Sequence, residues 1–162
     1  MKRLILLFFL LASIQQLNAQ EVALLDLNGL ERRLENGKDT VFVVNFWATW
    51  CAPCVAELPN FEKLQSAYRK EPLKVLLISL DFKSKLDKDV RPFVKKQKLN
   101  NEVFLLDEGN QQEFIERIST DWSGALPATL FVKKSVGHRS FFEQEFSYEE
   151  LEKRYKSINK QL

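Results

Sequence analysis

Residues 43–54 read VVNFWATWCAPC, a run of β-branched and aromatic residues that leads into two cysteines separated by two residues. Residues 41–47 are apolar apart from Asn45 and show no clean alternation, so they predict a central strand buried on both faces. A helix is predicted from about residue 53 to residue 69, because Pro53 suits a first helical turn and apolar residues recur on one side. The cysteines therefore lie where a buried strand gives way to a helix.

This position favours thiol chemistry at Cys51 and Cys54. The unpaired backbone N–H groups at a helix start stabilise the thiolate of Cys51, which is the reactive form. Cys54, one turn further into the helix, is better shielded and is predicted to resolve a mixed disulfide formed at Cys51. A purely structural disulfide is the first alternative, but closing a four-residue loop stabilises a fold by only about 2 kcal/mol.

A metal site is the second alternative for the two cysteines. Together with His138, the single histidine, they supply three soft ligands at most, one fewer than a closed structural zinc site needs. We therefore expect no metal and no cofactor other than a redox-active Cys51–Cys54 disulfide.

The start of the chain has the pattern of a secretory signal peptide. Lys2 and Arg3 precede a run over residues 4–14 that is apolar apart from Ser13, and residues 17–19 end in the small residue Ala19. The prediction is a signal peptide over residues 1–19, cleaved after Ala19. An uncleaved anchor is the alternative, although eleven helical residues reach only about half of the ~30 Å hydrocarbon core. Export to the periplasm would let a disulfide form and persist.

Composition predicts one globular domain over residues 20–162. Of the 162 residues, 45% are hydrophobic and 28% are charged, and only five are Gly and five Pro. Without Lys2 and Arg3, 22 Lys and Arg residues remain against 22 Asp and Glu residues. A neutral domain gives no electrostatic reason to bind nucleic acid, so no nucleic-acid partner is expected.

Strand and helix patterns alternate along the rest of the chain. Ser147 and Glu150 have the spacing of a capping box before a final helix. The alternation predicts an α/β fold with a mixed central sheet flanked by helices. The expected elements are a strand at 22–27 ending in an Asn28-Gly29 turn, a strand at 74–80, a helix at 86–98 interrupted by Pro92, a strand at 103–106, a helix at 111–118, and a hairpin of strands at 128–132 and 140–146.

Two motifs resemble a known family. Residues 43–54, with Glu57 and Pro59 following, resemble the active-site strand and helix of exported thioredoxin-like proteins of the TlpA and ResA type. Residues 124–129, GALPAT, resemble the second signature of these proteins, a cis-proline loop that faces the cysteines. The resemblance implies a thioredoxin-like fold with an added strand and helix, supplied here by residues 103–118.

The resemblance also directs attention to Asn45 and Glu57. Many thioredoxins have a buried Asp six residues before the first Cys, which helps to move the proton of the resolving thiol. Asn45 occupies that position here, and an amide cannot accept the proton. Glu57 lies three residues after Cys54, on the same helix face, and is the predicted substitute. The alternative is a first-turn Glu that merely complements the helix dipole.

The predicted substrate-binding residues are Trp50, Leu126 and Pro127. On sequence alone Pro127 is an ordinary turn proline. The resemblance implies a cis Leu126-Pro127 bond that exposes the backbone of Leu126 to an extended substrate, with Trp50 in the apolar rim. Trp122 either joins this rim or packs in the core.

The predicted activity is thiol–disulfide exchange on cysteine-containing exported proteins. The dipeptide Ala52-Pro53 lacks the His of strongly oxidising relatives, which favours a disulfide reductase. Such an enzyme needs a membrane thiol electron donor, and apocytochrome c thiols are one candidate substrate. The alternative is an extracytoplasmic copper carrier that uses both thiolates, although Met1 is the only methionine.

Overall fold

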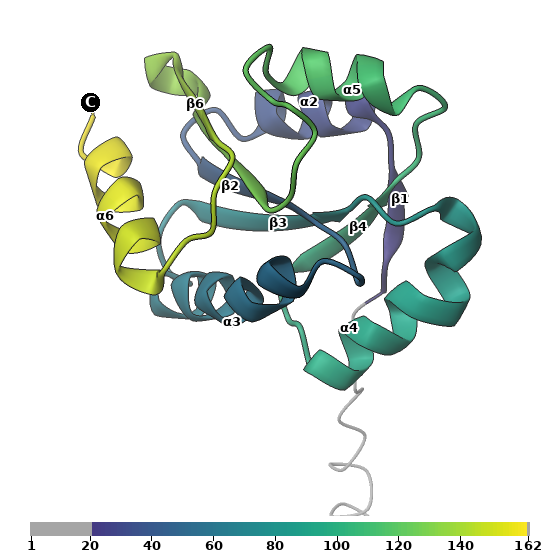
Figure 1. Ribbon diagram of the computed structural model, residues 1–162. Helices are drawn as coiled ribbons and strands as arrows, with labels where there is room; N and C mark the ends of the chain where they lie inside the picture. Colours follow the sequence, from purple (N-terminus) through teal and green to yellow (C-terminus); the bar gives the residue numbers. More distant parts are fainter. Residues whose placement is uncertain (1–20, 162) are drawn as a thin grey trace, which may run out of the picture.

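A computed structural model describes residues 21–161 of the chain. The predicted signal peptide, residues 1–19, lies outside the described residues. The strands are β1 (Ala23–Leu25), β2 (Val41–Trp47), β3 (Leu73–Ser79), β4 (Glu102–Leu106), β5 (Ala128–Lys133) and β6 (His138–Phe142). They form one mixed sheet in the order β1-β4-β3-β2-β5-β6 (Figure 1). The pairs among the first four strands in this order are parallel, and β5 and β6 are antiparallel to their neighbours.

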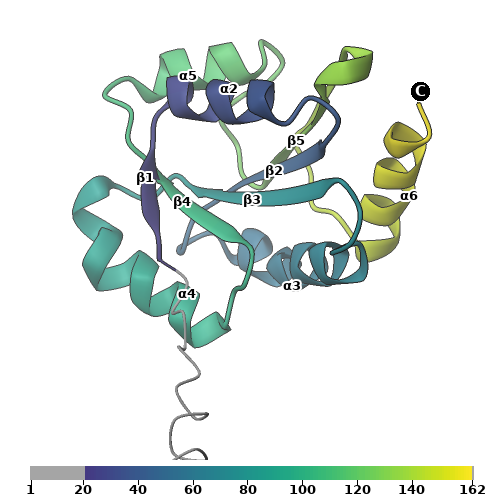
Figure 2. The same ribbon diagram turned by 180° about the vertical axis from the view of Figure 1, so that it is seen from behind.

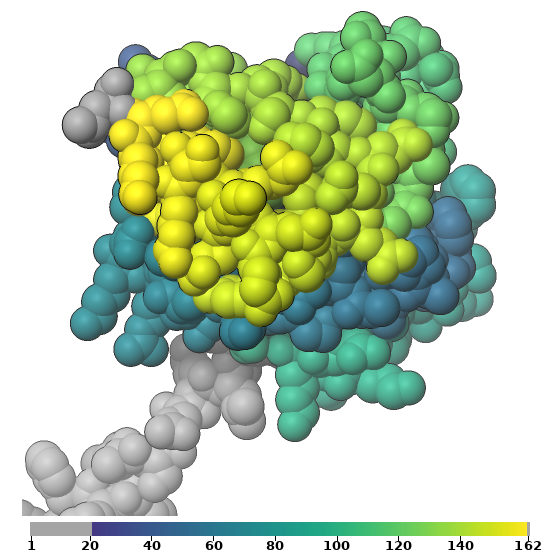
Figure 3. All heavy atoms as spheres, turned by 60° about the vertical axis from the view of Figure 1, so that its left-hand side comes forward, coloured from purple at the N-terminus to yellow at the C-terminus, as the bar shows by residue number. Residues whose placement is uncertain are grey.

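Helices cover both faces of this sheet. The α-helices are α2 (Leu27–Asn36), α3 (Ala52–Ala67), α4 (Arg91–Gln97), α5 (Gln111–Ile118) and α6 (Tyr148–Asn159). Figures 1 and 2 show α2 and α5 on one face and α3, α4 and α6 on the other. The space-filling view shows the yellow C-terminal segment lying against the blue segment that contains α3 (Figure 3). The predicted α/β architecture is therefore confirmed.

Strand β2 contributes to the cores on both sides of the sheet. All of its residues are buried, as the sequence predicts. Val43 and Trp47 belong to the apolar cluster beneath α3 and α6, whereas Val44 and Phe46 belong to the cluster beneath α2 and α5. Because successive strand residues alternate between faces, Asn45 points to the α3 side. The strand thereby brings one polar side chain to the face from which the cysteine-bearing helix extends.

The helix α2 is absent from the sequence prediction, which placed a turn at Asn28-Gly29. These two residues instead lie in the first turn of α2. Asp26 caps the helix by accepting a hydrogen bond from the backbone N–H of Gly29 at 2.7 Å. A Cβ at Gly29 would lie 2.8 Å from the capping oxygen, so this glycine permits a close approach rather than a turn. The apolar residues at helical spacing, Leu27, Leu30 and Leu34, are all buried.

Two other segments also differ from the sequence prediction. The second hairpin strand is residues 138–142, not 140–146, and a short 3₁₀ turn, η3 (Lys134–Val136), precedes it. Phe146 lies outside the sheet, and its backbone N–H donates a hydrogen bond to Glu57. The predicted helix over 86–98 begins as a π-helical turn, η2 (Leu86–Val90), before α4. Pro92 lies in the first turn of α4, directly after the π-helical turn.

The predicted added strand and helix are present as β4 and α5, and the capping box before α6 is confirmed. Ser147 accepts from the backbone N–H of Glu150, and the Glu150 carboxylate accepts from the backbone N–H of Ser147. β4 lies between β1 and β3, so the added strand is an interior strand of the sheet and not an edge strand.

Candidate active site

The cysteines lie at the carboxyl end of β2, as predicted. Cys51 is the N-cap residue of α3, and its Sγ accepts a hydrogen bond from the backbone N–H of Cys54 at 3.3 Å. The two residues form a disulfide. Cys51 retains 6% of its surface exposed and Cys54 none. A backbone N–H directed at Cys51 Sγ stabilises negative charge there, and the greater exposure of Cys51 suits the residue that meets a substrate first.

Glu57 is a buried carboxylic acid on the same helix, with 3% of its surface exposed. Its Oε1 accepts from Asn45 Nδ2 at 2.8 Å, and its Oε2 accepts from the backbone N–H of Phe146 at 2.8 Å. The pKa of Glu57 is raised to about 7, mainly by burial; the two hydrogen bonds oppose this rise, and the nearby Glu145 carboxylate adds a smaller raising effect. A carboxyl group with such a pKa can both accept and donate a proton near neutral pH.

The alternative for Glu57, a first-turn residue that complements the helix dipole, is wrong. The helix α3 begins at Ala52 and has no acidic residue in its first turn, so Glu57 lies in the second turn. Its carboxyl points into the protein toward β2 rather than along the helix axis, because its partners are Asn45 and Phe146. The role of Glu57 as proton acceptor stays a prediction.

Asn45 connects Glu57 to the strand that follows the proline loop. Besides Glu57, its Nδ2 lies 3.2 Å from Thr129 Oγ1 and 3.4 Å from the carbonyl oxygen of Ala128. Asn45 is fully buried, and its Oδ1 has no hydrogen-bond partner among the described residues. The amide therefore fixes the orientation of the Glu57 carboxyl without adding a second charge.

The proline loop reaches the cysteine end of the sheet because of strand register. β5 runs antiparallel to β2 with Ala128 opposite Phe46, so Pro127 lies beside the end of β2 from which Cys51 follows. The Leu126-Pro127 bond is cis, as the resemblance implies. Pro127 is buried and Leu126 is half-buried. Their contact with a substrate stays a prediction.

Trp122 packs in the core and does not join the apolar rim. Its ring lies 4.8 Å from that of Phe46, measured between centroids, and belongs to the cluster beneath α2 and α5. Its Nε1 donates to the carbonyl oxygen of Ala125 at 2.9 Å, which ties the proline loop to this core. Trp50, by contrast, is 71% exposed next to Cys51, in agreement with a place on the rim.

Asp81, which the sequence analysis missed, holds the loop before Cys51. It is buried at the end of β3 and accepts from the backbone N–H of Thr49 at 2.9 Å and from Thr49 Oγ1 at 2.7 Å. Its Oδ2 also accepts from Ser79 Oγ at 2.7 Å. An acidic residue directly after a buried strand was the available signal. That signal does not reveal the partner of Asp81, because Thr49 lies in a different loop.

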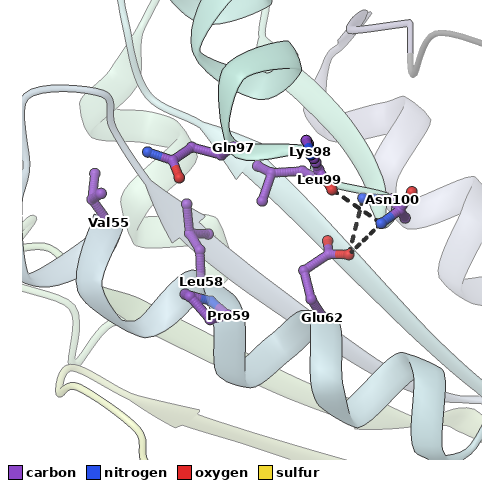
Figure 4. Close-up of a pocket in the computed structure, with 8 residues that line it drawn as sticks. All are labelled: Val55, Leu58, Pro59, Glu62, Gln97, Lys98, Leu99 and Asn100. Carbon is purple, nitrogen blue, oxygen red and sulfur yellow. Dashed lines mark hydrogen bonds between the residues drawn. The ribbon is translucent and has the colours of Figure 1, made fainter.

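A pocket of about 220 Å³ lies between α3 and the end of α4 (Figure 4). Val55, Leu58, Pro59 and Leu99 form its apolar wall, and Glu62 accepts a hydrogen bond from the backbone N–H of Asn100 at its polar end. Neither cysteine nor Pro127 lines this pocket. In residues 21–161, no group of three or more His, Cys, Asp or Glu side chains is placed to hold a metal ion. No helix among those residues is long and apolar enough to cross a membrane.

Comparison with known proteins agrees with this geometry. Residues 16–137 match the family model described as the AhpC/TSA family. The chain belongs to the AhpC/TSA family. The thioredoxin-like protein YneN of Bacillus subtilis is 32% identical over 96 residues, which cover 59% of this chain and 56% of YneN. The chain thus matches little more than half of that relative's length.

A longer match is to the thiol–disulfide oxidoreductase ResA of Geobacillus kaustophilus. It is 26% identical over 140 residues, which cover 86% of this chain and 75% of ResA. The crystal structure of a thioredoxin-related protein from Neisseria meningitidis serogroup B superposes with a TM-score of 0.63 at 26% identity, over 72% of this chain and 83% of that one. The predicted thioredoxin-like fold and the resemblance to the TlpA and ResA type are confirmed, and the relatives' names agree with the predicted enzyme class.

Proposed function

We propose that this protein is a thiol–disulfide oxidoreductase that reduces disulfides in exported proteins. The observation that carries the proposal is the Cys51–Cys54 disulfide at the start of α3, with the protonatable Glu57 buried on the same helix. A disulfide that closes so short a loop contributes little stability, whereas its position at a helix start favours a reactive thiolate.

The reaction begins with the reduced protein. The Cys51 thiolate attacks one sulfur of a substrate disulfide, forms a mixed disulfide and releases the other substrate sulfur as a thiolate. The Cys54 thiol then loses its proton to Glu57 and attacks Cys51 Sγ. This step forms the Cys51–Cys54 disulfide and releases the second substrate sulfur, so that two electrons pass from the cysteine pair to the substrate. The released thiolates take up protons from Glu57 and from water.

The buried hydrogen bonds of Glu57 support its role in the second step. Asn45 and the backbone of Phe146 hold the carboxyl in one orientation, and burial raises its pKa to about 7, near neutral pH. Trp50, Leu126 and Pro127 are the proposed contacts for the substrate segment that carries the reacting cysteine. Their support is their position at the carboxyl end of β2 and the exposure of Trp50.

The proposal also includes the direction of electron transfer and the cellular compartment. The Ala52-Pro53 dipeptide lacks a His that would favour an oxidant, so we propose a reductase. Regeneration of the dithiol requires a reducing partner, proposed to be a membrane thiol electron donor. The predicted signal peptide favours a periplasmic protein, for which apocytochrome c thiols are one candidate substrate.

Trapping of the mixed disulfide tests the proposed mechanism. Cys54→Ala is expected to accumulate a covalent complex with a disulfide-containing protein, because the resolving thiol is absent, and Cys51→Ala is expected to accumulate none. Non-reducing electrophoresis and mass spectrometry detect the complex. Equal trapping by both variants would overturn the order of attack.

The reduction potential of the cysteine pair tests the proposed direction. A value near −270 mV, as in thioredoxin, supports a reductase, whereas a value near −120 mV identifies an oxidant. Equilibration of the protein with glutathione redox buffers gives this value.

A further inference from the structure

Two exposed aromatic side chains lie beyond the carboxyl ends of β2 and β3, the edge of the sheet at which the cysteines lie. Among the described residues, the large hydrophobic side chains most exposed to solvent are Trp50 and Phe82, each at 71%, followed by Leu24 at 40%. Trp50 directly precedes Cys51, and Phe82 follows β3. Aromatic side chains left in water beside a reactive centre are characteristic of a protein-binding surface, because their burial contributes strongly to association.

Strand register places Trp50 and Phe82 at the same edge of the sheet. β2 and β3 are parallel neighbours, with Trp47 opposite Ser79. Trp50 and Phe82 each lie three residues beyond this pair, past the carboxyl ends of the two strands. Figure 1 shows β2 and β3 side by side. The backbone N–H of Leu80 also donates to the carbonyl oxygen of Trp47 at 2.8 Å, so the two segments remain hydrogen-bonded just past the last residue of β3.

Asp81 fixes the two loops to each other. It is only 4% exposed, and both of its carboxylate oxygens accept hydrogen bonds from Thr49, at 2.9 and 2.7 Å. Asp81 immediately precedes Phe82, and Thr49 immediately precedes Trp50. One buried carboxylate therefore joins the backbones of the two loops that carry the aromatic residues.

The segment that follows Phe82 is strongly basic. Residues 83–98 contain seven Lys and Arg residues, all exposed, against two Asp residues. Lys83 pairs with Asp107, Lys85 with Asp89, and Arg91 with Asp87. The remaining four lysines form no salt bridge with any described residue; they are Lys88, Lys95, Lys96 and Lys98. This segment lies on the α3 side of the sheet, the side of the cysteines (Figures 1 and 2).

We propose that Trp50 and Phe82 form a docking surface for an acidic polypeptide whose reacting cysteine is flanked by an apolar residue. The apolar residue packs against the two aromatic rings, and carboxylates of the polypeptide interact with the basic segment at 83–98. This inference rests on the proposed thiol–disulfide exchange and adds the class of substrate. Opposite charges raise the rate of encounter, and apolar contact at Trp50 and Phe82 lengthens the life of the complex beside Cys51.

Peptide disulfides of matched length test this surface. Three peptides carry one cysteine as a mixed disulfide with glutathione: one with Leu beside the cysteine and four Glu, one with Leu and four Lys, and one with Ser and four Glu. The reduced protein is expected to react with the first about tenfold faster than with the second at low salt, and this ratio falls as salt screens the charges. The ratio of the first to the third measures the apolar contact.

Variants test whether Phe82 causes the preference for Leu and whether the basic segment causes the preference for Glu. Phe82→Ser is expected to bring the Leu-to-Ser rate ratio toward one, whereas Phe82→Leu retains most of it. A double variant, Lys88→Glu with Lys96→Glu, is expected to reduce the Glu-to-Lys ratio. The matched controls are Leu24→Ser, an exposed apolar residue on β1, and Lys153→Glu, an exposed lysine on α6, and both should keep the parental ratios.

Equal rates with all three peptides would overturn the docking surface and leave the proposed exchange reaction intact. Parental ratios in both Phe82→Ser and the double lysine variant would also overturn it. Absence of reaction with every peptide and with glutathione disulfide would overturn the proposed function itself, and the docking surface with it.

Discussion

The two faces of β2 are packed with different chemistry. On the side of α2 and α5, Val44 and Phe46 lie in an apolar cluster to which Trp122 also belongs. On the side of α3, Asn45 is surrounded by apolar residues yet binds the carboxyl of Glu57 and the hydroxyl of Thr129. The cluster on the side of α2 and α5 stabilises the fold mainly by burial of apolar side chains. The side of α3 retains the buried carboxyl group of Glu57, three residues after Cys54, at a cost that depends on whether that group is ionised.

This difference has a consequence for pH. The folded pKa of Glu57 is about 7, above the ordinary value of 4.5 that it regains on unfolding. Between these values the folded protein binds more protons than the unfolded chain, so stability falls as pH rises through this range. Below pH 4.5 the group is protonated in both states and its burial costs least. The apolar face contains no group of this kind among its clustered residues, so its contribution is expected to be independent of pH.

The largest expected loss of stability comes from a substitution in the apolar cluster beneath α2 and α5. Trp122→Ala removes a buried ring that packs on Phe46 and should lower the free energy of unfolding by about 3–5 kcal/mol. Urea unfolding at pH 5 and pH 8 should give the same loss. Trp50→Ala is the matched surface control, expected to change stability by less than about 0.5 kcal/mol. A loss for Trp122→Ala that grows with pH would contradict the separation of the two faces.

The next effect removes the ionisable group from the polar face. Glu57→Gln should become progressively more stable, relative to the parent, as pH rises from 4.5 to above 7, by roughly 3 kcal/mol in total. Denaturant unfolding across this pH range measures the difference. Glu149→Gln, an exposed residue of α6, should show no such trend. A pH-independent difference for Glu57→Gln would mean that the carboxyl ionises as it does in water.

The same variant tests the chemistry of the polar face. In the reduced protein, a carboxylate on the same helix face as Cys54 disfavours a second negative charge, so Glu57→Gln should lower a thiol pKa while slowing the reduction of protein disulfides. Thiol titration and turnover measure the two effects. Parental values for both would show that water or the substrate accepts the Cys54 proton.

A smaller stability effect comes from adding a second carboxyl to the polar face. Asn45→Asp would place two carboxyl groups in hydrogen-bond contact, and one of them must keep a proton. We expect a loss of about 1–3 kcal/mol at pH 8 and a smaller loss at pH 5, measured by thermal or urea unfolding. An equal loss at both pH values would indicate that packing, rather than charge, excludes Asp at this position.

The smallest effect tests the surroundings of Glu57. Glu145 is exposed, and its charge raises the pKa of the buried Glu57 carboxyl. Glu145→Gln should therefore move the titration midpoint of Glu57 downward by about a few tenths of a pH unit, because exposed charges are screened by solvent. NMR of the side-chain carboxyl carbon gives this midpoint. A rise in the midpoint would show that Glu145 lowers, rather than raises, the pKa of Glu57.

The sequence by itself determined the features that depend on neighbouring residues. The buried strand, the helix after it and the cysteine pair at their junction follow from a continuous run of residues. The same is true of the capping box at Ser147, whose two hydrogen bonds join residues three apart. Such interactions are local, so residue type and spacing suffice to predict them. Where local signals conflicted, as at Asn28-Gly29, burial of the leucines of α2 decided the outcome.

Only the tertiary structure decided which distant residues share the site. Asn45 reaches Thr129 because β2 and β5 are sheet neighbours, and Glu57 reaches the backbone of Phe146 because the chain leaves the sheet before α6. Asp81 reaches Thr49 because two parallel strands end together. The sequence named Glu57 as a candidate proton acceptor, but its raised pKa depends on burial by segments far along the chain, and no local pattern contains that information.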